Sequence, residues 1–335
     1  MNQCFPRAPL LLISKGIFMD PKTLFMNTAR SMGLTACGAC SIHFSEELSE
    51  RLSQAGPVPF APTEAEERLS PEALLPGAES FFVILFPYKT EERERGNIAL
   101  YARPEDYHRL NHRYMERIIA AVKAVYPEAE CKALTDTSPM VDRWLAYAAG
   151  LGFFGWNHCL IHPVYGSYVT IGAILTTLSL TPDKPLTLSC GDCHLCEKAC
   201  PGKIIGKDPF NPWHCKSYLT QKKEELTEEE KNIIGRTPLI FGCDACQDCC
   251  PFNRKAPPSP LPEIRENRIP TLTREMMESL SNRAFDKTYK NYAFAWRGKK
   301  VLLRNWDIVH EKGAADAAPG AEGSKDSEDS EKKGS

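Results

Sequence analysis

The chain has 335 residues, of which 42% are hydrophobic and 25% are charged. This length and composition exclude a disulfide-stabilised mini-protein and a wholly disordered chain. The 41 basic and 43 acidic side chains nearly balance, so bulk charge does not indicate a nucleic-acid partner, which would need a local basic patch.

The N-terminal region carries no membrane or export signal. Its apolar run, Pro9–Ser14, is shorter than a membrane span or the hydrophobic part of a signal peptide. We therefore expect a cytoplasmic protein with no membrane partner. Met19 directly precedes the first helix signal, and residues 1–18 are interpreted as an N-terminal extension.

Helices and strands alternate in the next part of the chain, which predicts an α/β domain over residues 19–180. Asp20 and Pro21 form a helix start, and Gly33 can end that helix in the left-handed conformation. Apolar periodicity and β-branched runs predict the other main elements. These are a strand at 80–88, a long helix at 105–126, a short helix closed at Gly150 and a strand at 167–178.

The remaining chain divides into three segments by composition. Residues 181–258 are rich in cysteine and proline and predict a small metal-organised domain. The stiff connector "PPSPLP" leads into a C-terminal helical segment, 259–312. Residues 313–335 hold six acidic and three basic side chains among Ala, Gly and Ser, which predicts a disordered acidic tail.

Nine of the fourteen cysteines fall between residues 190 and 250. Without an export signal, such crowding indicates metal binding rather than disulfides. Cys190, Cys193, Cys196 and Cys200, followed by Pro201, form the run C-x2-C-x2-C-x3-C-P, which is typical of bacterial ferredoxins. Three of these thiolates can hold one 4Fe-4S cluster, while the fourth reaches a second cluster.

A second cysteine run, "CDACQDCCP", supplies the partner that this arrangement requires. We assign one cluster to Cys190, Cys193, Cys196 and Cys250. The other cluster takes Cys200, Cys243, Cys246 and one more thiolate, which the spacing leaves open between Cys249 and Cys215. Two zinc sites, or clusters that only stiffen the fold, are the alternatives. Two adjacent clusters would serve better as a path for electrons.

The α/β region offers few catalytic residues by pattern alone. Asp136 follows an apparent strand, where a buried carboxyl group could donate a proton, although such a residue is more often a helix cap or an ion-pair partner. "GLGFFG" at 150–155 follows a helix and precedes a strand, the reverse of a dinucleotide-binding context. His108 and His112 share a helix face but have no third ligand nearby.

A set of longer motifs is similar to a known family. The motifs are "LYARPEDYH", "TDTSPMVDR", "AGLGFFGWNHCLI", "YGSY", "CGDCHLCEKACPGKII", "CKSYLT", "FGCDACQDCCPFN" and "KKVLLRNW". In this order, over residues 20–306, they resemble the epoxyqueuosine reductases. The resemblance implies a nitroreductase-like α/β domain that binds cobalamin and a ferredoxin-like domain with two 4Fe-4S clusters. It also implies that Cys215, not Cys249, completes the second cluster.

The same resemblance implies roles for individual residues. Asp136 matches the proposed proton donor of the family and lies in a segment near the cofactor. The other residues expected near cobalamin are Tyr107, His108, Asn157, His158, Leu160, Ser167 and Ser217. The chain has no D-x-H-x-x-G cobalamin signature, which fits a family that holds cobalt without a histidine ligand.

The chain departs from the family at two places. Trp156 stands where a lysine is usual, and an acidic tail follows "LLRNW" in place of a helical-repeat domain that grips tRNA. We therefore predict a short, monomeric member of the family. It would reduce epoxyqueuosine to queuosine in tRNA with electrons from an external donor. A related cobalamin-dependent reductase of a halogenated or other small molecule, and a two-cluster electron carrier, are the alternatives.

Overall fold

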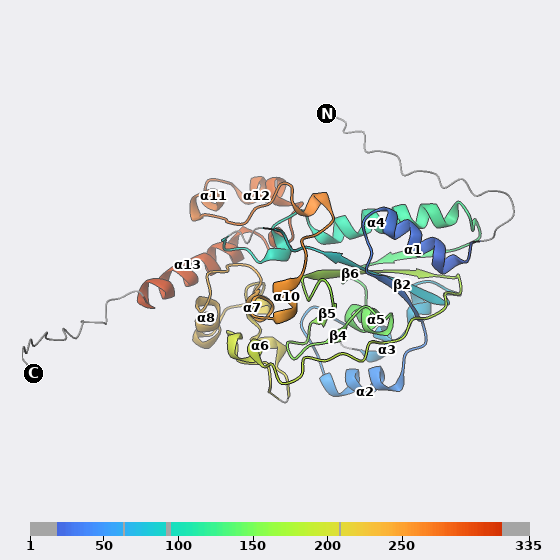
Figure 1. Cartoon of the computed structure of the whole chain (residues 1–335). Helices are drawn as coiled ribbons and strands as arrows, with labels where there is room; N and C mark the ends of the chain where they lie inside the picture. The colour runs from blue at the N-terminus through green and yellow to red at the C-terminus, as the bar shows by residue number, and fades with distance from the viewer. Residues whose placement is uncertain (1–18, 63, 92–94, 208, 317–335) are drawn as a thin grey trace, which may run out of the picture.

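The computed structural model describes residues 19–62, 64–91, 95–207 and 209–316. A sheet with helices on both faces forms one side of the molecule, and short helices form the other (Figure 1). The predicted N-terminal extension lies outside the described residues, as does the predicted tail from residue 317 onward.

Four strands form the main sheet. They are β1 (Cys37–Ser41), β2 (Ser80–Pro87), β3 (Cys131–Leu134) and β6 (Val169–Thr176). The spatial order is β1-β2-β6-β3, and every neighbouring pair is antiparallel. The predicted strands at 80–88 and 167–178 are confirmed as β2 and β6. Sequence reasoning missed β1, because "CGACS" lacks the β-branched and aromatic residues that favour strands.

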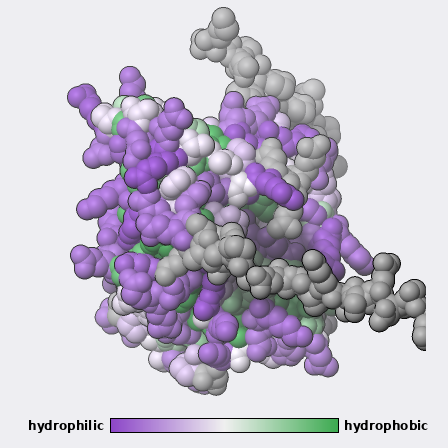
Figure 2. Space-filling view, turned by 90° about the vertical axis from the view of Figure 1, so that its left-hand side faces the viewer, coloured by the Kyte–Doolittle hydropathy of each residue, from purple (hydrophilic) through white to green (hydrophobic). Residues whose placement is uncertain are grey.

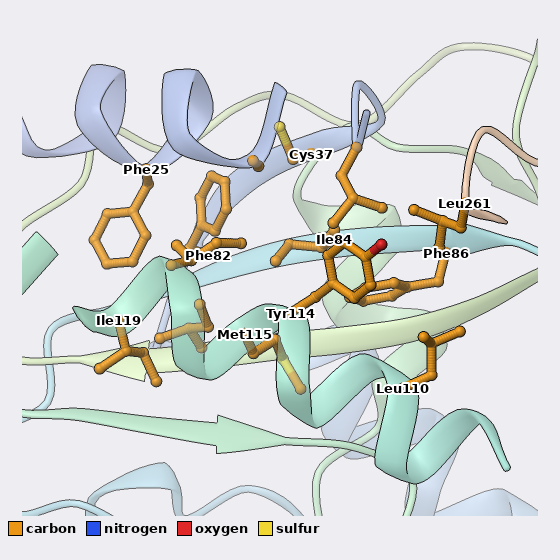
Figure 3. Packing of buried hydrophobic residues seen from close by; sticks show 14 of the residues in the cluster. Phe25, Cys37, Phe82, Ile84, Phe86, Leu110, Tyr114, Met115, Ile119 and Leu261 are labelled. Carbon is orange, nitrogen blue, oxygen red and sulfur yellow. The ribbon is translucent and has the colours of Figure 1, made fainter. Parts of the chain in front are cut away.

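One face of the sheet is covered by α1 (Pro21–Ser31) and α4 (Tyr107–Lys123). α1 begins as predicted, because Asp20 accepts hydrogen bonds from the backbone N–H groups of Lys22 and Thr23. α4 lies within the predicted helix 105–126 and begins two residues later, after the cap Asp106. Figure 3 shows their apolar side chains meeting those of β2 over this face. This packing fixes the N-terminal end of α4 relative to the sheet.

The opposite face is covered by α5 (Asp142–Ala148), with α2 (Glu46–Ala55) and α3 (Ala65–Arg68) outside it (Figure 1). Between α5 and β6 the chain forms a small hairpin of β4 (Phe153–Phe154) and β5 (Leu160–Ile161). Gly150 has a φ of +70° and ends the short helix, as predicted.

The cysteine-rich region folds into short elements joined by loops. These are α6 (Leu195–Ala199), η3 (Pro212–His214), α7 (Lys216–Leu219), α8 (Glu228–Gly235), α9 (Ala245–Asp248) and α10 (Pro251–Lys255). α6 packs against α9, so the two cysteine runs lie side by side although about 50 residues separate them.

The C-terminal helices share a core with this region. They are α11 (Arg274–Glu278), α12 (Asn282–Tyr289) and α13 (Lys299–Asp316), with the short turn η5 (Ala293–Ala295). Their apolar residues pack with those of α7, α8 and residues 98–102. α13 confirms the predicted helix at the end of the chain and continues past residue 312 to Asp316.

The side of the molecule formed by α8, α11 and α13 is mainly hydrophilic, with apolar residues showing in small separate areas (Figure 2). Among the residues that the structure describes, no helix is long and apolar enough to span a bilayer.

Asn305 connects α13 to the cysteine-rich region. Its side-chain amide is fully buried and donates to the backbone carbonyls of Thr220 (2.7 Å) and Ile240 (2.9 Å). In Asn305→Leu both carbonyls lose their donor, which costs about 1–3 kcal/mol for each buried group. We expect a matching fall in the free energy of unfolding, measured by urea denaturation. The exposed variant Lys300→Ala on the same helix should leave it unchanged.

Candidate functional site

The first cysteine group surrounds a cavity. Cys190, Cys193, Cys196 and Cys250 line a partly open cavity of about 180 Å³ together with Trp156, Asn157, Ile161, Phe252 and residues beside the cysteines. Burial, together with the neighbouring Cys249, raises the pKa of the Cys196 thiol to about 11. The free Cys196 thiol is therefore neutral at pH 7, and a metal must displace its proton to bind.

The second cysteine group lies around Cys215. Burial raises the pKa of the Cys215 thiol, and Cys200 is close enough to add to this effect. Burial raises the pKa of Cys243 to about 12, with Cys215 as a contributing neighbour. The pKa of Cys246 is raised by a contact with Cys159, by burial and by the charges of both Cys243 and Cys215.

Cys249 lies with the first group rather than the second. Its neighbours include Cys193 and Cys250, and its thiol donates to the carbonyl of Cys246 at 3.5 Å. Within the described residues, no three His, Cys, Asp or Glu side chains converge tightly enough to hold a single metal ion.

The helix that carries Cys215 is fixed by a buried lysine. Lys216 is 1% exposed, and its ammonium group donates to the carbonyls of Ile234 (2.6 Å) and Thr237 (2.8 Å). Burial lowers the pKa of Lys216 to about 7. These contacts hold α7 against the end of α8.

The cysteine-rich region joins the sheet through Asn253, which is 2% exposed. Its side-chain oxygen accepts from the N–H of Ser167 (2.6 Å), and its amide donates to the Ser167 hydroxyl (2.9 Å) and to the carbonyl of Gln247 (2.7 Å). Gly166 permits this approach, because a Cβ there would lie 1.9 Å from the Asn253 side-chain oxygen. The strand β6 and the second cysteine run thus form one rigid unit.

A second constellation forms where α4 begins. Asp136, in the loop after β3, accepts a hydrogen bond from the Tyr107 hydroxyl and pairs with His108 Nε2 at 2.5 Å. His108 Nδ1 lies 2.7 Å from Asp106, the residue that caps α4. The rings of Tyr107 and His108 stack at 4.1 Å. Because Asp106 caps α4, the first two residues of this helix, Tyr107 and His108, both contact the carboxylate of Asp136.

These groups perturb one another's ionisation. Burial favours the neutral imidazole of His108, but hydrogen bonds to Asp106 and Asp136 outweigh it and raise its pKa to about 10. Burial, reinforced by Asp136, raises the pKa of the Tyr107 hydroxyl well above its usual value. His108 is thus a cation at neutral pH, and Tyr107 keeps its proton.

Tyr107 and Asp136 line an open pocket of about 440 Å³. Its walls are mixed: apolar groups of Phe60, Met140, Val169 and Ile171 alternate with hydroxyls, the carboxyl group of Asp142 and the charged side chains of Arg68 and Arg143. A larger cavity of about 760 Å³, between residues 95–103 and 237–248, contains no residue predicted from the sequence.

Sequence reasoning assigned no role to Asp142, although it stands in the "TDTSPMVDR" motif. Burial and the nearby Asp136 raise its pKa to about 8, so the pocket holds a carboxyl group that stays protonated at neutral pH. Its place in this motif was the only feature that could have indicated a role, because an aspartate in the first turn of a helix such as α5 is common.

The other residues predicted to contact a cofactor do not line this pocket. Asn157 lines the cavity of the first cysteine group, and Leu160 is buried in the core of the sheet domain. The His158 ring lies 4.0 Å from that of Phe210. The Ser217 backbone carbonyl, in α7, accepts a hydrogen bond from the side chain of Gln221, just after the helix. Ser167 forms the hydrogen bonds with Asn253 that connect the cysteine-rich region to the sheet.

Trp156, His112 and two cysteines outside the cysteine-rich region also have clear positions. Trp156 is 45% exposed, and its indole N–H donates to the carbonyl of Gly191 at 3.0 Å, over the first cysteine loop. Cys37 and Cys40 are buried in β1. His112 pairs only loosely with Glu116, at 3.7 Å on the exposed face of α4.

Two family models match the chain in the regions that carry these features. Residues 68–137 match the model described as "Epoxyqueuosine reductase QueG, DUF1730". Residues 189–253 match a 4Fe-4S double cluster binding domain. The first match ends beside Asp136, and the second contains both cysteine groups.

Curated relatives extend the match over most of the chain. The epoxyqueuosine reductase of Staphylococcus aureus is 31% identical over 312 residues, covering 87% of this chain and 80% of that protein. The chain belongs to the epoxyqueuosine reductase family. The member from Cyclobacterium marinum is 30% identical over 303 residues, covering 86% of this chain and 96% of that protein.

Solved structures of the family have the same fold. The epoxyqueuosine reductase of Streptococcus thermophilus superposes with a TM-score of 0.74 at 29% identity, over 86% of this chain and 80% of that one. An epoxyqueuosine reductase solved with an epoxyqueuosine-modified tRNA-Tyr stem loop gives a TM-score of 0.75 at 28% identity, over 85% and 79% of the two chains. The α/β fold and the double 4Fe-4S domain are family features.

His108 predicts a dependence of stability on pH. Its pKa rises from 6.5 to about 10 on folding, so its pairing with Asp106 and Asp136 stabilises the protein fully below about pH 6.5. This contribution then falls as the pH rises and is absent above about pH 10. We expect the difference in Tm between the wild type and His108→Gln to shrink between these values, measured by thermal unfolding. A constant difference would contradict the charged pairing.

Proposed function

We propose that this protein is an oxidoreductase that reduces epoxyqueuosine in tRNA to queuosine, with two 4Fe-4S clusters and cobalamin as cofactors. Membership of the family supports the reaction, and the relative solved with a modified tRNA stem loop supports the substrate. The observation that carries the proposal is the position of Asp136, which meets Tyr107 and His108 at the wall of an open pocket.

The cysteine geometry fits two iron-sulfur clusters. We propose that Cys190, Cys193, Cys196 and Cys250 hold one cluster, because they line a single cavity. Cys200, Cys215, Cys243 and Cys246 would hold the other, because burial and mutual charge link them around Cys215. The proximity of Cys249 to the first group supports Cys215 as the eighth ligand.

The pocket beside Asp136 fits an edge of a corrinoid. Apolar side chains from β6 and the 138–141 loop can cover the face of a macrocycle, while the hydroxyls of Tyr88, Ser138 and Thr170 can meet its amide groups. We therefore assign cobalamin to the domain of residues 19–180, which we class as nitroreductase-like. Residues 181–258 would form the ferredoxin-like domain, and 259–312 would be the C-terminal helical segment.

Removal of the epoxide oxygen as water consumes two electrons and two protons. When bound, cobalamin and the clusters would supply the electrons, which an external donor replaces. Asp136 would protonate the leaving oxygen. His108 carries a proton beside this carboxylate, so it can replace the proton that Asp136 delivers, while the Tyr107 hydroxyl donates a hydrogen bond that positions the carboxylate. A tRNA substrate would place the activity in the cytoplasm, and we propose that a monomer carries it out.

Iron content tests the ligand assignment. Cys215→Ala and Cys250→Ala should each lose one cluster and so roughly half of the iron, because each removes one of four ligands. Cys249→Ala, a matched variant in the same run, should keep all of it. Iron is measured after anaerobic purification. A loss of iron in Cys249→Ala but not in Cys215→Ala would reverse the assignment, and zinc in place of iron would reject the clusters.

Asp136→Asn tests the reaction and its proton donor together. The variant should keep both clusters and cobalamin but lose about 10²- to 10⁴-fold in turnover, because an amide cannot donate this proton. The measurement is the queuosine and epoxyqueuosine content of tRNA from a strain lacking the enzyme, complemented with either form. Wild-type complementation that leaves epoxyqueuosine unconverted would reject the function, and an active variant would remove Asp136 from the mechanism.

A further inference from the structure

We infer that an exposed aromatic platform at the mouth of the pocket stacks a nucleobase of the RNA, next to the nucleotide being reduced. The platform consists of Phe60, Tyr218, Trp296 and the guanidinium of Arg297. The inference rests on the proposed function and extends it, because it identifies a contact that would select unpaired RNA.

The platform is assembled from three distant segments. The Phe60 ring lies 5.5 Å from that of Tyr218 in α7 and 5.4 Å from that of Trp296, which follows η5. The Arg297 guanidinium packs 3.6 Å from the centre of the Trp296 ring and 5.0 Å from that of Phe60. The Trp296 indole N–H donates to the Gln221 side chain at 2.8 Å, which fixes the orientation of the ring.

The two outer rings remain open to solvent in spite of these contacts. Phe60 is 53% exposed and Trp296 is 51% exposed, among the most exposed large apolar residues of the described chain. Phe60 also has a φ of +63°, a conformation that is unfavourable for a bulky residue and tends to persist at functional sites. Neither burial nor backbone preference accounts for a phenylalanine at this position.

The platform is continuous with the proposed catalytic pocket. Phe60 lines the same cavity as Tyr107 and Asp136, together with the neighbouring residues Pro59, Ala61 and Pro62. A base that enters this pocket must leave the stack of its neighbours, which then expose their own faces. Proteins commonly cover such faces with aromatic rings or arginine planes. The platform lies where a flanking nucleotide would emerge.

The charge of the protein also favours stacking as the source of affinity. The formal net charge is −2, so general attraction to phosphate is weak. Three arginines nevertheless lie around the pocket: Arg68 and Arg143 in its wall and Arg297 on the platform. The Nε atoms of Arg68 and Arg297 are buried without a hydrogen-bond partner among the described residues. A stacked nucleotide would bring phosphate and base acceptors to these groups.

Binding of a synthetic anticodon stem-loop RNA to the anaerobically purified holoenzyme tests this inference. The RNA carries 2-aminopurine beside the wobble position, so stacking quenches its fluorescence. Phe60→Leu and Trp296→Leu keep an apolar side chain but remove the ring, and should weaken binding roughly 5- to 150-fold and abolish the quenching. Trp296→Phe should retain most of both signals. Val164→Ala, an exposed position outside the platform, should behave as the wild type.

The outcomes separate the inference from the proposed function. Unchanged affinity and quenching in the leucine variants, with a wild type that converts epoxyqueuosine in tRNA, would overturn the platform and leave the function intact. Loss of corrinoid stoichiometry with unchanged RNA affinity would also overturn it, because the rings would then serve the cofactor. A wild-type holoenzyme that neither binds nor converts this RNA would overturn the function and the platform together.

Discussion

The structure depends on the exchange of one cysteine between two distant runs. Cys250, from the second run, lies with Cys190, Cys193 and Cys196, while Cys200, from the first, lies beside Cys215. Neither group is complete unless α6 and α9 pack together. Because each cluster would need ligands from both runs, metal binding and the folding of this region are coupled. The relative position of the two groups is then fixed by the fold itself.

The same constraint extends to the sheet. Asn253 lies three residues after Cys250 and forms hydrogen bonds with Ser167, just before β6. The first residues of β6, 169–171, line the pocket with Asp136. The start of α4 brings Tyr107 and His108 to Asp136 at the same pocket. The cysteine groups and the carboxylate are therefore connected through Asn253, Ser167 and β6.

Several expectations concerned residues that the structure places apart. Asn157 lines the first cysteine cavity and Leu160 lies in the core, while only Tyr107, His108 and Asp136 meet. These residues were predicted together by segment, and their side chains face different parts of the structure. Asp142 and Phe60 carry no distinctive spacing, and they acquire significance only from their neighbours in space.

Local patterns in the sequence determined much of this protein. Residues close together in the chain determine the ends of α1 and α5, the strands β2 and β6, the long helix α4 and the ferredoxin-like cysteine run. These features could therefore be predicted from short stretches of sequence. Only the tertiary structure decided which sulfurs meet, that Asp136 contacts Tyr107 and His108, and that Phe60 meets Trp296 more than 230 residues away. Such contacts depend on how helices pack on the antiparallel sheet, and no short stretch of sequence encodes that packing.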